Sequence, residues 1–129
     1  MRCVSFLAAP VLLAACAATT DPKLPIRSGT YVFEHRDAEF DSPGFPVAVT
    51  IRGYNIFVAY DGPNVCMREM QGPNNVIYDS VLMWHQESAQ WILGYDDADR
   101  DADEVGGCSG GPETVDFEKR IIWSCVCGP

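Results

Sequence analysis

The sequence predicts an all-β fold: a small antiparallel barrel or sandwich of six to seven short strands, held together by disulfide bonds. Helical periodicity is nearly absent, and short β-branched and aromatic runs are separated by Gly, Pro, Asn and Asp. Residues 28–129 are enough for one domain and too few for two. This part of the chain also contains an even number of cysteines, which is typical of a disulfide-bonded exported domain.

The expected strands follow one another along the chain. GTYVFEH (29–35) is the first, and FPVAVTIRG (45–53) with NIFVAYDG (55–62) is the clearest hairpin, because Gly53 at its turn suits a type II′ conformation. Val47, Val49 and Ile51 alternate with smaller or polar residues, so one face of the second strand is apolar.

The second half of the domain gives a similar pattern. NVIYDSVLMWH (75–85) and QWILGYD (90–96) form a second expected hairpin, joined by Gln86 to Ala89, and RIIWSCVC (120–127) is the last strand. PNVCMREMQGPNN (63–75) contains turn residues at both ends, so we expect a short strand or a loop around Cys66.

The tryptophans and histidines have structural interpretations. Trp84, Trp91 and Trp123 each lie in an expected strand among aliphatic residues; we expect them in the core, and a ligand-stacking cluster is the alternative. His35 and His85 lie at strand ends, where a lone histidine is structural or solvated. No Ser-His-Asp order, paired-carboxylate signature or Gly-rich phosphate loop is present, so the sequence predicts no catalytic residue and a protein that is not an enzyme.

The N-terminus has the layout of an export signal. Met1-Arg2 is a short basic start, and Val4 to Ala15 is an apolar run that is too short to span a bilayer. The run ends in Leu13-Ala14-Ala15-Cys16, which resembles the lipobox of bacterial lipoproteins. This resemblance implies a signal peptide at 1–15, a lipid on Cys16, and a bacterial membrane as the site of anchoring.

Two further points concern this region. The alternative is ordinary signal-peptidase cleavage, since Ala15-Cys16-Ala17 also has the small-x-small form. In the lipoprotein family an aspartate after the acylated cysteine retains many members in the inner membrane, so Ala17 favours the outer membrane. Residues 16–27 contain two prolines and no apolar periodicity, and we expect a flexible tether between the membrane and the domain.

The domain's cysteines are Cys66, Cys108, Cys125 and Cys127. Two disulfides are the expected use of these cysteines, and a zinc site is the alternative; the CVC spacing at the C-terminus does not match a zinc knuckle. Cys125 and Cys127 would point to the same face of a strand, so each is expected to pair with one of the other two. If the chain turns within Asp116 to Arg120, the favoured pairs are Cys108–Cys125 and Cys66–Cys127; the alternative is Cys108–Cys127 with Cys66–Cys125.

The charge is strongly acidic. The formal net charge is −9 at pH 7, and it becomes −10 when the signal is removed because Arg2 leaves with it. The sequence pI of about 4.4 argues against a nucleic-acid partner and against electrostatic docking on anionic lipid. It is compatible with a basic protein, a cationic peptide or a metal ion as partner.

The most acidic stretch is YDDADRDADEVGGCSGG (95–111). The favoured interpretation is a solvated loop fixed at its far end by Cys108, which would be a recognition surface. A weak calcium site is the alternative, because calcium needs converging carboxylates and an alternating D-x-D-x-D spacing supplies them; no other cofactor is expected. Such a site would not be an EF-hand, because both registers lack the required Gly and Glu. The candidate calcium ligands are Asp97, Asp99, Asp101 and Asp103, and the candidate recognition loop contains Asp96, Asp97, Asp99, Asp101, Asp103 and Glu104.

Two resemblances bear on function. VLMWHQESAQWIL resembles the tryptophan-bearing hairpin of membrane-bound bacterial lysozyme inhibitors, but their Ser-Gly-x-x-Tyr motif is one residue short here, at Ser28-Gly29-Thr30-Tyr31. GTYVFE resembles the start of lipocalin-type barrels, with Tyr31 in place of tryptophan, which implies an apolar cavity. The sequence therefore predicts a membrane-anchored periplasmic or surface lipoprotein with a non-catalytic binding or structural β domain. An inhibitor of a basic cell-wall hydrolase and a small-ligand binder are the alternatives.

Overall fold

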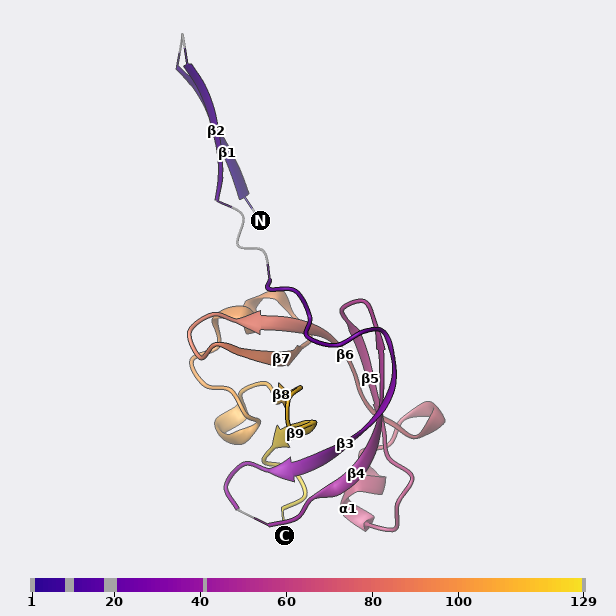
Figure 1. Cartoon of the computed structure of the whole chain (residues 1–129). Helices are drawn as coiled ribbons and strands as arrows, with labels where there is room; N and C mark the ends of the chain where they lie inside the picture. The colour runs from indigo at the N-terminus through magenta and orange to yellow at the C-terminus, as the bar shows by residue number, and fades with distance from the viewer. Residues whose placement is uncertain (1, 9–10, 18–20, 41, 129) are drawn as a thin grey trace.

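The computed structural model describes residues 2–8, 11–17, 21–40 and 42–128, with side chains from Asp21 onward. Its main body is a closed seven-stranded barrel, which confirms the all-β prediction (Figure 1). The barrel strands are β3 (Gly29–Asp37), β4 (Phe45–Arg52), β5 (Asn55–Ala59), β6 (Val76–His85), β7 (Gln90–Gly94), β8 (Thr114–Asp116) and β9 (Ile121–Ser124). A separate two-stranded sheet pairs β1 (Arg2–Ala8) with β2 (Val11–Ala17).

The barrel is an antiparallel meander closed by one parallel pair. Each strand pairs with the next in sequence, and β3 pairs in parallel with β9, with Glu34 opposite Ile121. The parallel pair follows from the strand count, because the first and seventh strands of an up-and-down meander run in the same direction. The sequence predicts consecutive antiparallel strands but not this parallel closure.

Side-chain alternation fills the barrel. In β4, Val47, Val49 and Ile51 are buried in the core, as the sequence pattern predicts. Leu82 of β6 and Leu93 of β7, which face each other in register, are fully buried as well. The barrel interior is therefore packed with side chains.

The segment around Cys66 differs from the expected strand or loop. Residues Val65–Glu69 form the short helix α1, and Asn64 begins it by accepting a hydrogen bond on its side chain from the Met67 N–H at 3.0 Å. Asparagine is a favoured residue at this N-cap position. Met67, with 0% of its surface exposed, fastens the helix to the core.

Two disulfide bonds staple the barrel. Cys66 of α1 is bonded to Cys127, with 5.6 Å between the Cα atoms, and Cys108 is bonded to Cys125, with 4.9 Å between the Cα atoms. These are the pairs that the sequence favours if the chain turns within Asp116 to Arg120. That turn is present between β8 and β9, where Asp116 accepts a hydrogen bond from the Lys119 N–H at 2.9 Å.

Part of the expected tether lies on the barrel instead. Leu24 and Ile26 pack against the hydrophobic core, and Asp21 forms an ion pair with Arg100. The Tyr54 hydroxyl also donates to the Pro22 carbonyl at 3.5 Å. Residues 21–27 of the expected tether therefore contact the barrel in this structure. No helix among the described residues has the length and apolar character needed to cross a membrane.

Candidate functional site

The aspartates proposed as calcium ligands do not converge. Asp97–Asp101 form the 3₁₀ helix η2 rather than an extended loop. A 3₁₀ helix has three residues per turn, so carboxylates at every second position spread around its axis. No three of the candidate side chains Asp97, Asp99, Asp101 and Asp103 form a potential metal-ligating group among the described residues, so these carboxylates alone do not make a calcium site in this arrangement.

Several of these carboxylates already have partners. Asp96 caps η2 by accepting from the Ala98 N–H at 2.8 Å. Asp99 accepts from the backbone N–H groups of Tyr95 and Asp96, at 2.8 and 3.0 Å. Asp97 pairs with Arg100 at 3.0 Å. The first part of the acidic stretch is thus ordered by its own side chains.

His85 holds the second part of the stretch. This histidine, 2% exposed, lies with Nε2 2.7 Å from the Ala102 carbonyl and Nδ1 2.6 Å from the Ser88 hydroxyl. His85 therefore has a structural role, which is one of the two roles expected from the sequence. The Cys108–Cys125 bond holds the far end, so Asp101, Asp103 and Glu104 are exposed on a fixed support.

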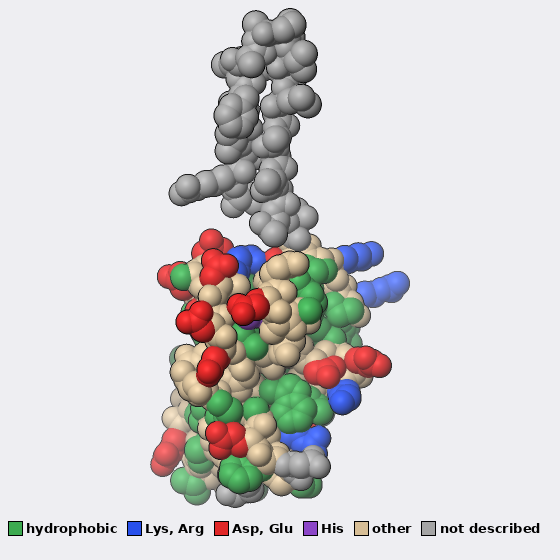
Figure 2. Space-filling view, turned by 90° about the vertical axis from the view of Figure 1, so that its left-hand side faces the viewer, with side chains coloured by type: hydrophobic (Ala, Val, Ile, Leu, Met, Phe, Trp, Pro, Cys, Tyr) green, Lys and Arg blue, Asp and Glu red, His purple; other side chains and the backbone are tan. Residues whose placement is uncertain are grey.

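Acidic side chains are also spread over the wider face. Figure 2 shows Asp and Glu side chains across the left-hand side of the barrel, with hydrophobic side chains between them. We use the name acidic segment for residues 96–104 from here on. Because the segment is exposed and held at both ends, it presents its charges to a partner at little further cost in ordering.

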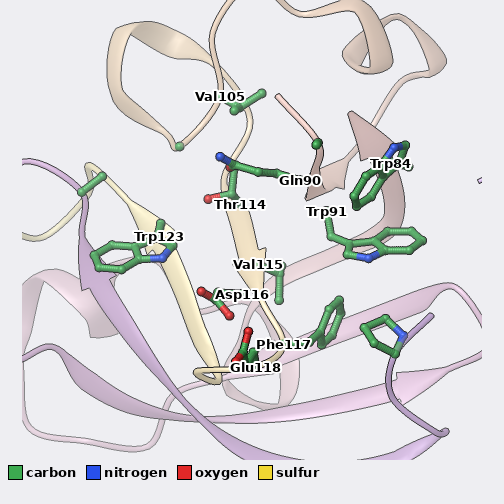
Figure 3. A pocket seen from close by; sticks show the side chains of 14 residues that line it. Trp84, Gln90, Trp91, Val105, Thr114, Val115, Asp116, Phe117, Glu118 and Trp123 are labelled. Atoms are coloured by element: carbon green, nitrogen blue, oxygen red, sulfur yellow. The ribbon is translucent and has the colours of Figure 1, made fainter. Parts of the chain in front are cut away.

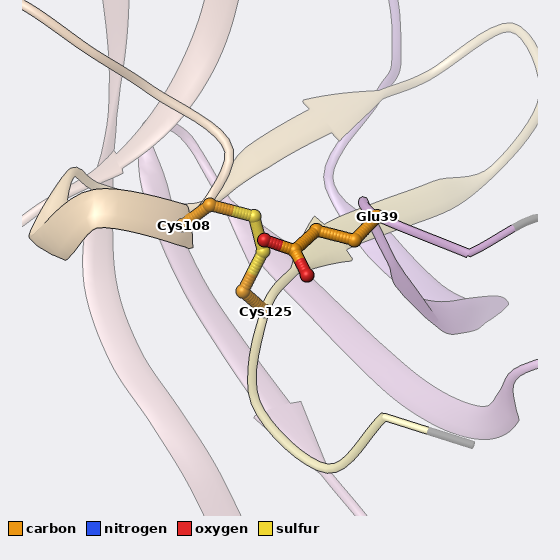
Figure 4. Close-up of side chains that lie close together, drawn as sticks. All are labelled: Glu39, Cys108 and Cys125. Atoms are coloured by element: carbon orange, nitrogen blue, oxygen red, sulfur yellow. A yellow bond between two sulfur atoms is a disulfide. The ribbon is translucent and has the colours of Figure 1, made fainter.

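One group of potential metal ligands does come together among the described residues. The ligand atoms of Glu39, Cys108 and Cys125 lie within 4.8 Å of one another (Figure 4). The two sulfurs are bonded to each other, and metal binding by cysteine requires thiolates. In the disulfide-bonded protein this cluster is not a metal centre.

A groove of about 750 Å³ opens beside the acidic segment (Figure 3). Trp84, Trp91 and Phe117 form one wall; the ring centroids of the two tryptophans are 5.3 Å apart, and those of Trp91 and Phe117 are 6.3 Å apart. Trp123 stands on the other side, and β8 runs between them. All three tryptophans of the chain line this groove.

The polar groups of the groove are acidic or neutral. Asp116 and Glu118 lie between the aromatic walls, and Gln90 and Thr114 lie at the opposite end (Figure 3). The described residues that line the groove include no lysine or arginine. Val105 and Gly106, which directly follow the acidic segment, are part of the lining, so the segment and the groove are continuous.

The sequence prediction for the tryptophans is correct only for Trp91, which is buried in the core. Trp84 packs against the core but is partly exposed, and Trp123 is partly exposed beside Arg36, whose guanidinium lies 5.7 Å from the ring centroid. Trp123 pairs in register with Thr114 on β8. Asp116 and Glu118 are close to Trp123 in the sequence, and this closeness is the one local sign of a shared site. That Trp84 lines the same groove depends on pairing between distant strands.

A polar network lies inside the barrel. His35 Nε2 is 2.8 Å from the Tyr78 hydroxyl, which donates to Ser124 Oγ at 3.5 Å. Burial lowers the pKa of His35 to about 4, against a smaller opposing effect of the Asp37 carboxylate. Burial also raises the pKa of Tyr78. His35 and Ser124 are 1% and 0% exposed, so the network stabilises the core and does not form a reactive site.

No protein-family model, no curated protein and no solved structure matches this chain.

Proposed function

We propose that the protein is an exported lipoprotein, anchored through Cys16, whose β barrel is a non-catalytic domain that binds a basic protein. The observation that carries the proposal is the acidic segment: Asp101, Asp103 and Glu104 are exposed on a support fixed by His85 and by the Cys108–Cys125 bond. The net charge, −9 for the whole chain and −10 once Arg2 is removed with the signal, adds a long-range attraction for cationic partners.

The packed interior argues against a lipocalin-like role. Leu82, Leu93 and Ile122 are fully buried, and they occupy the space that a ligand-filled barrel would leave open. The two disulfides are consistent with an oxidising compartment such as the periplasm or the cell surface, which supports export.

Inhibition of a basic cell-wall hydrolase is the more specific form of the same proposal. It is favoured by the hairpin β6–β7, in which Trp84 and Trp91 face each other in register. Ser28 and Tyr31 of the shortened motif hold local structure, since Ser28 accepts from the Gly53 N–H at 3.0 Å and Tyr31 donates to the Arg27 carbonyl at 2.8 Å. Inhibition would therefore have to use a different surface from that motif.

Neutralising the acidic segment is expected to weaken binding of a basic protein. Asp101→Asn, Asp103→Asn and Glu104→Gln together remove three exposed charges but leave the capping residues Asp96 and Asp99 intact. With c-type lysozyme as a basic probe, calorimetry at low salt should show roughly tenfold weaker binding, because each exposed charge pair contributes up to about 1 kcal/mol.

The matched control is Asp61→Asn, Glu69→Gln and Glu87→Gln, which removes three exposed charges outside the acidic segment. It should retain most of the wild-type affinity, and salt at about 0.5 M should weaken binding of the wild type. Equal losses in the two triple variants would mean that only the overall charge matters, and the acidic segment would not be the binding surface.

Lipidation is expected at Cys16. Mass spectrometry of the protein extracted from membranes should show an N-terminal cysteine carrying acyl chains, and Cys16→Ser should leave the protein soluble or unprocessed. Mature protein that begins at Ala17 or Ala18 without lipid would contradict the anchor but not the binding role of the barrel.

A further inference from the structure

The groove combines aromatic walls with an acidic floor. Trp84 and Phe117 on one side and Trp123 on the other are partly exposed, so their rings are accessible to a ligand. Asp116 is partly exposed and Glu118 is exposed, and both lie between the walls (Figure 3). A volume of about 750 Å³ is within the range of ligand sites and exceeds what one side chain would fill.

We propose that this groove binds a basic peptide segment, with an arginine or lysine side chain held between the aromatic walls and the carboxylates of Asp116 and Glu118. The proposal rests on the proposed function, because the segment would belong to the basic protein that the acidic segment attracts. It adds the position and the chemistry of the contact.

Charge complementarity selects the occupant. The described lining has two carboxylates and no lysine or arginine, so a cation would match the charge of the groove better than an anion or a neutral group. Aromatic rings attract cations through their negative faces, and tryptophan does so most strongly. Arg36 already shows this contact in the protein, since its guanidinium lies 5.7 Å from the centroid of the Trp123 ring.

A neutral sugar is the other ligand that aromatic walls suit. It would stack on Trp84 or Trp123, but it would leave the two carboxylates without a counter-charge. The continuity of the groove with the acidic segment through Val105 and Gly106 also favours one extended basic partner that covers both. These observations favour a basic peptide, and the test below includes sugar binding as the competing result.

Intrinsic fluorescence reports on the groove directly, because all three tryptophans of the chain line it. The full-length protein is titrated with tetra-arginine amide, with tetraglycine amide and with the trimer of N-acetylglucosamine. A saturable change in tryptophan emission is expected with the arginine peptide alone. A saturable change with the sugar and none with the arginine peptide would overturn the proposal.

The variant for this test is Asp116→Asn with Glu118→Gln. An asparagine side chain at the first position keeps an oxygen that can accept from the Lys119 N–H, so the β8–β9 turn should be retained, which circular dichroism checks. The matched control is Asp61→Asn with Glu69→Gln, which removes the same charge from exposed positions that do not line the groove. The groove variant should bind the arginine peptide at least about fivefold more weakly, and the control within about twofold of wild type. Equal affinities of the two variants would overturn the proposal.

The two proposals fail in different ways. If the acidic-segment variant loses lysozyme binding while the arginine peptide leaves the fluorescence unchanged, the groove proposal is wrong and the proposed function stands. If the peptide binds in the groove while both triple variants bind lysozyme equally, the groove proposal stands and the acidic segment is not the recognition surface.

Discussion

Replacing Cys66 and Cys127 by alanine is expected to lower the free energy of unfolding by about 4 kcal/mol, because it removes a cross-link that restricts the unfolded chain. The two residues are 61 positions apart, and the entropy that a cross-link removes from the unfolded state grows with the logarithm of this separation. The bond also ties α1, and with it the buried Met67, to the C-terminal end of the chain. Urea unfolding at neutral pH measures the effect.

The second disulfide provides the comparison. Cys108 and Cys125 are 17 positions apart, so alanine at both is expected to cost about 3 kcal/mol, less than the first pair. Peptide mapping of the non-reduced wild type should recover Cys66 with Cys127 and Cys108 with Cys125. Two results would contradict this account of the disulfides: recovery of a bond between Cys125 and Cys127, or a larger loss of unfolding free energy when the shorter loop is opened.

Acidification is expected to destabilise the barrel through His35. In the unfolded chain a histidine has a pKa of about 6.5, whereas burial holds the pKa of His35 at about 4 in the folded protein. The unfolded state therefore binds more protons between these values, and the stability that is fully present above pH 6.5 is lost as the pH falls through this window. The loss attributable to His35 is about 3 kcal/mol, and it is complete once the folded histidine also protonates.

His35→Gln isolates this effect, because glutamine does not titrate. The variant should be less stable at neutral pH, since it alters the contact with the Tyr78 hydroxyl, but its stability should change less between pH 6.5 and 4. Glu113, whose pKa is raised by burial, acts in the opposite direction in both proteins and cancels in the comparison. The same loss of stability in both proteins over this window would contradict the assignment, and NMR titration of the His35 ring in the wild type checks its pKa directly.

The strands could be predicted because their signal is local. The alternation of Val47, Val49 and Ile51 and the turn at Gly53 mark the β4–β5 hairpin within the sequence itself. The sequence favoured the observed disulfide pairs on condition of a turn between Asp116 and Arg120, and it left one other pairing open. Each of these features depends on a short stretch of chain and on simple geometry.

What could not be predicted depends on long-range packing. The acidic segment has an alternating pattern, but capping by Asp96 and Asp99 winds its first part into a 3₁₀ helix and separates the carboxylates. The groove brings Trp84 and Phe117 to opposite sides of Trp91, although they are far apart in the sequence. The sequence gives no sign that Leu24 and Ile26 pack against the core, because the residues they contact come together only in the folded barrel. Residues 21–27 were therefore expected to be a tether.

The central claim is that a basic protein binds the acidic segment and the adjoining groove. The most direct measurement is a titration of the ¹⁵N-labelled protein with c-type lysozyme, followed by two-dimensional NMR. The account predicts saturable, salt-sensitive changes at residues 96–106, at Asp116 and Glu118, and at the indole N–H groups of Trp84 and Trp123. Changes centred on α1 (Val65–Glu69), which the Cys66–Cys127 bond ties to the C-terminal end, or no saturable change, would contradict it.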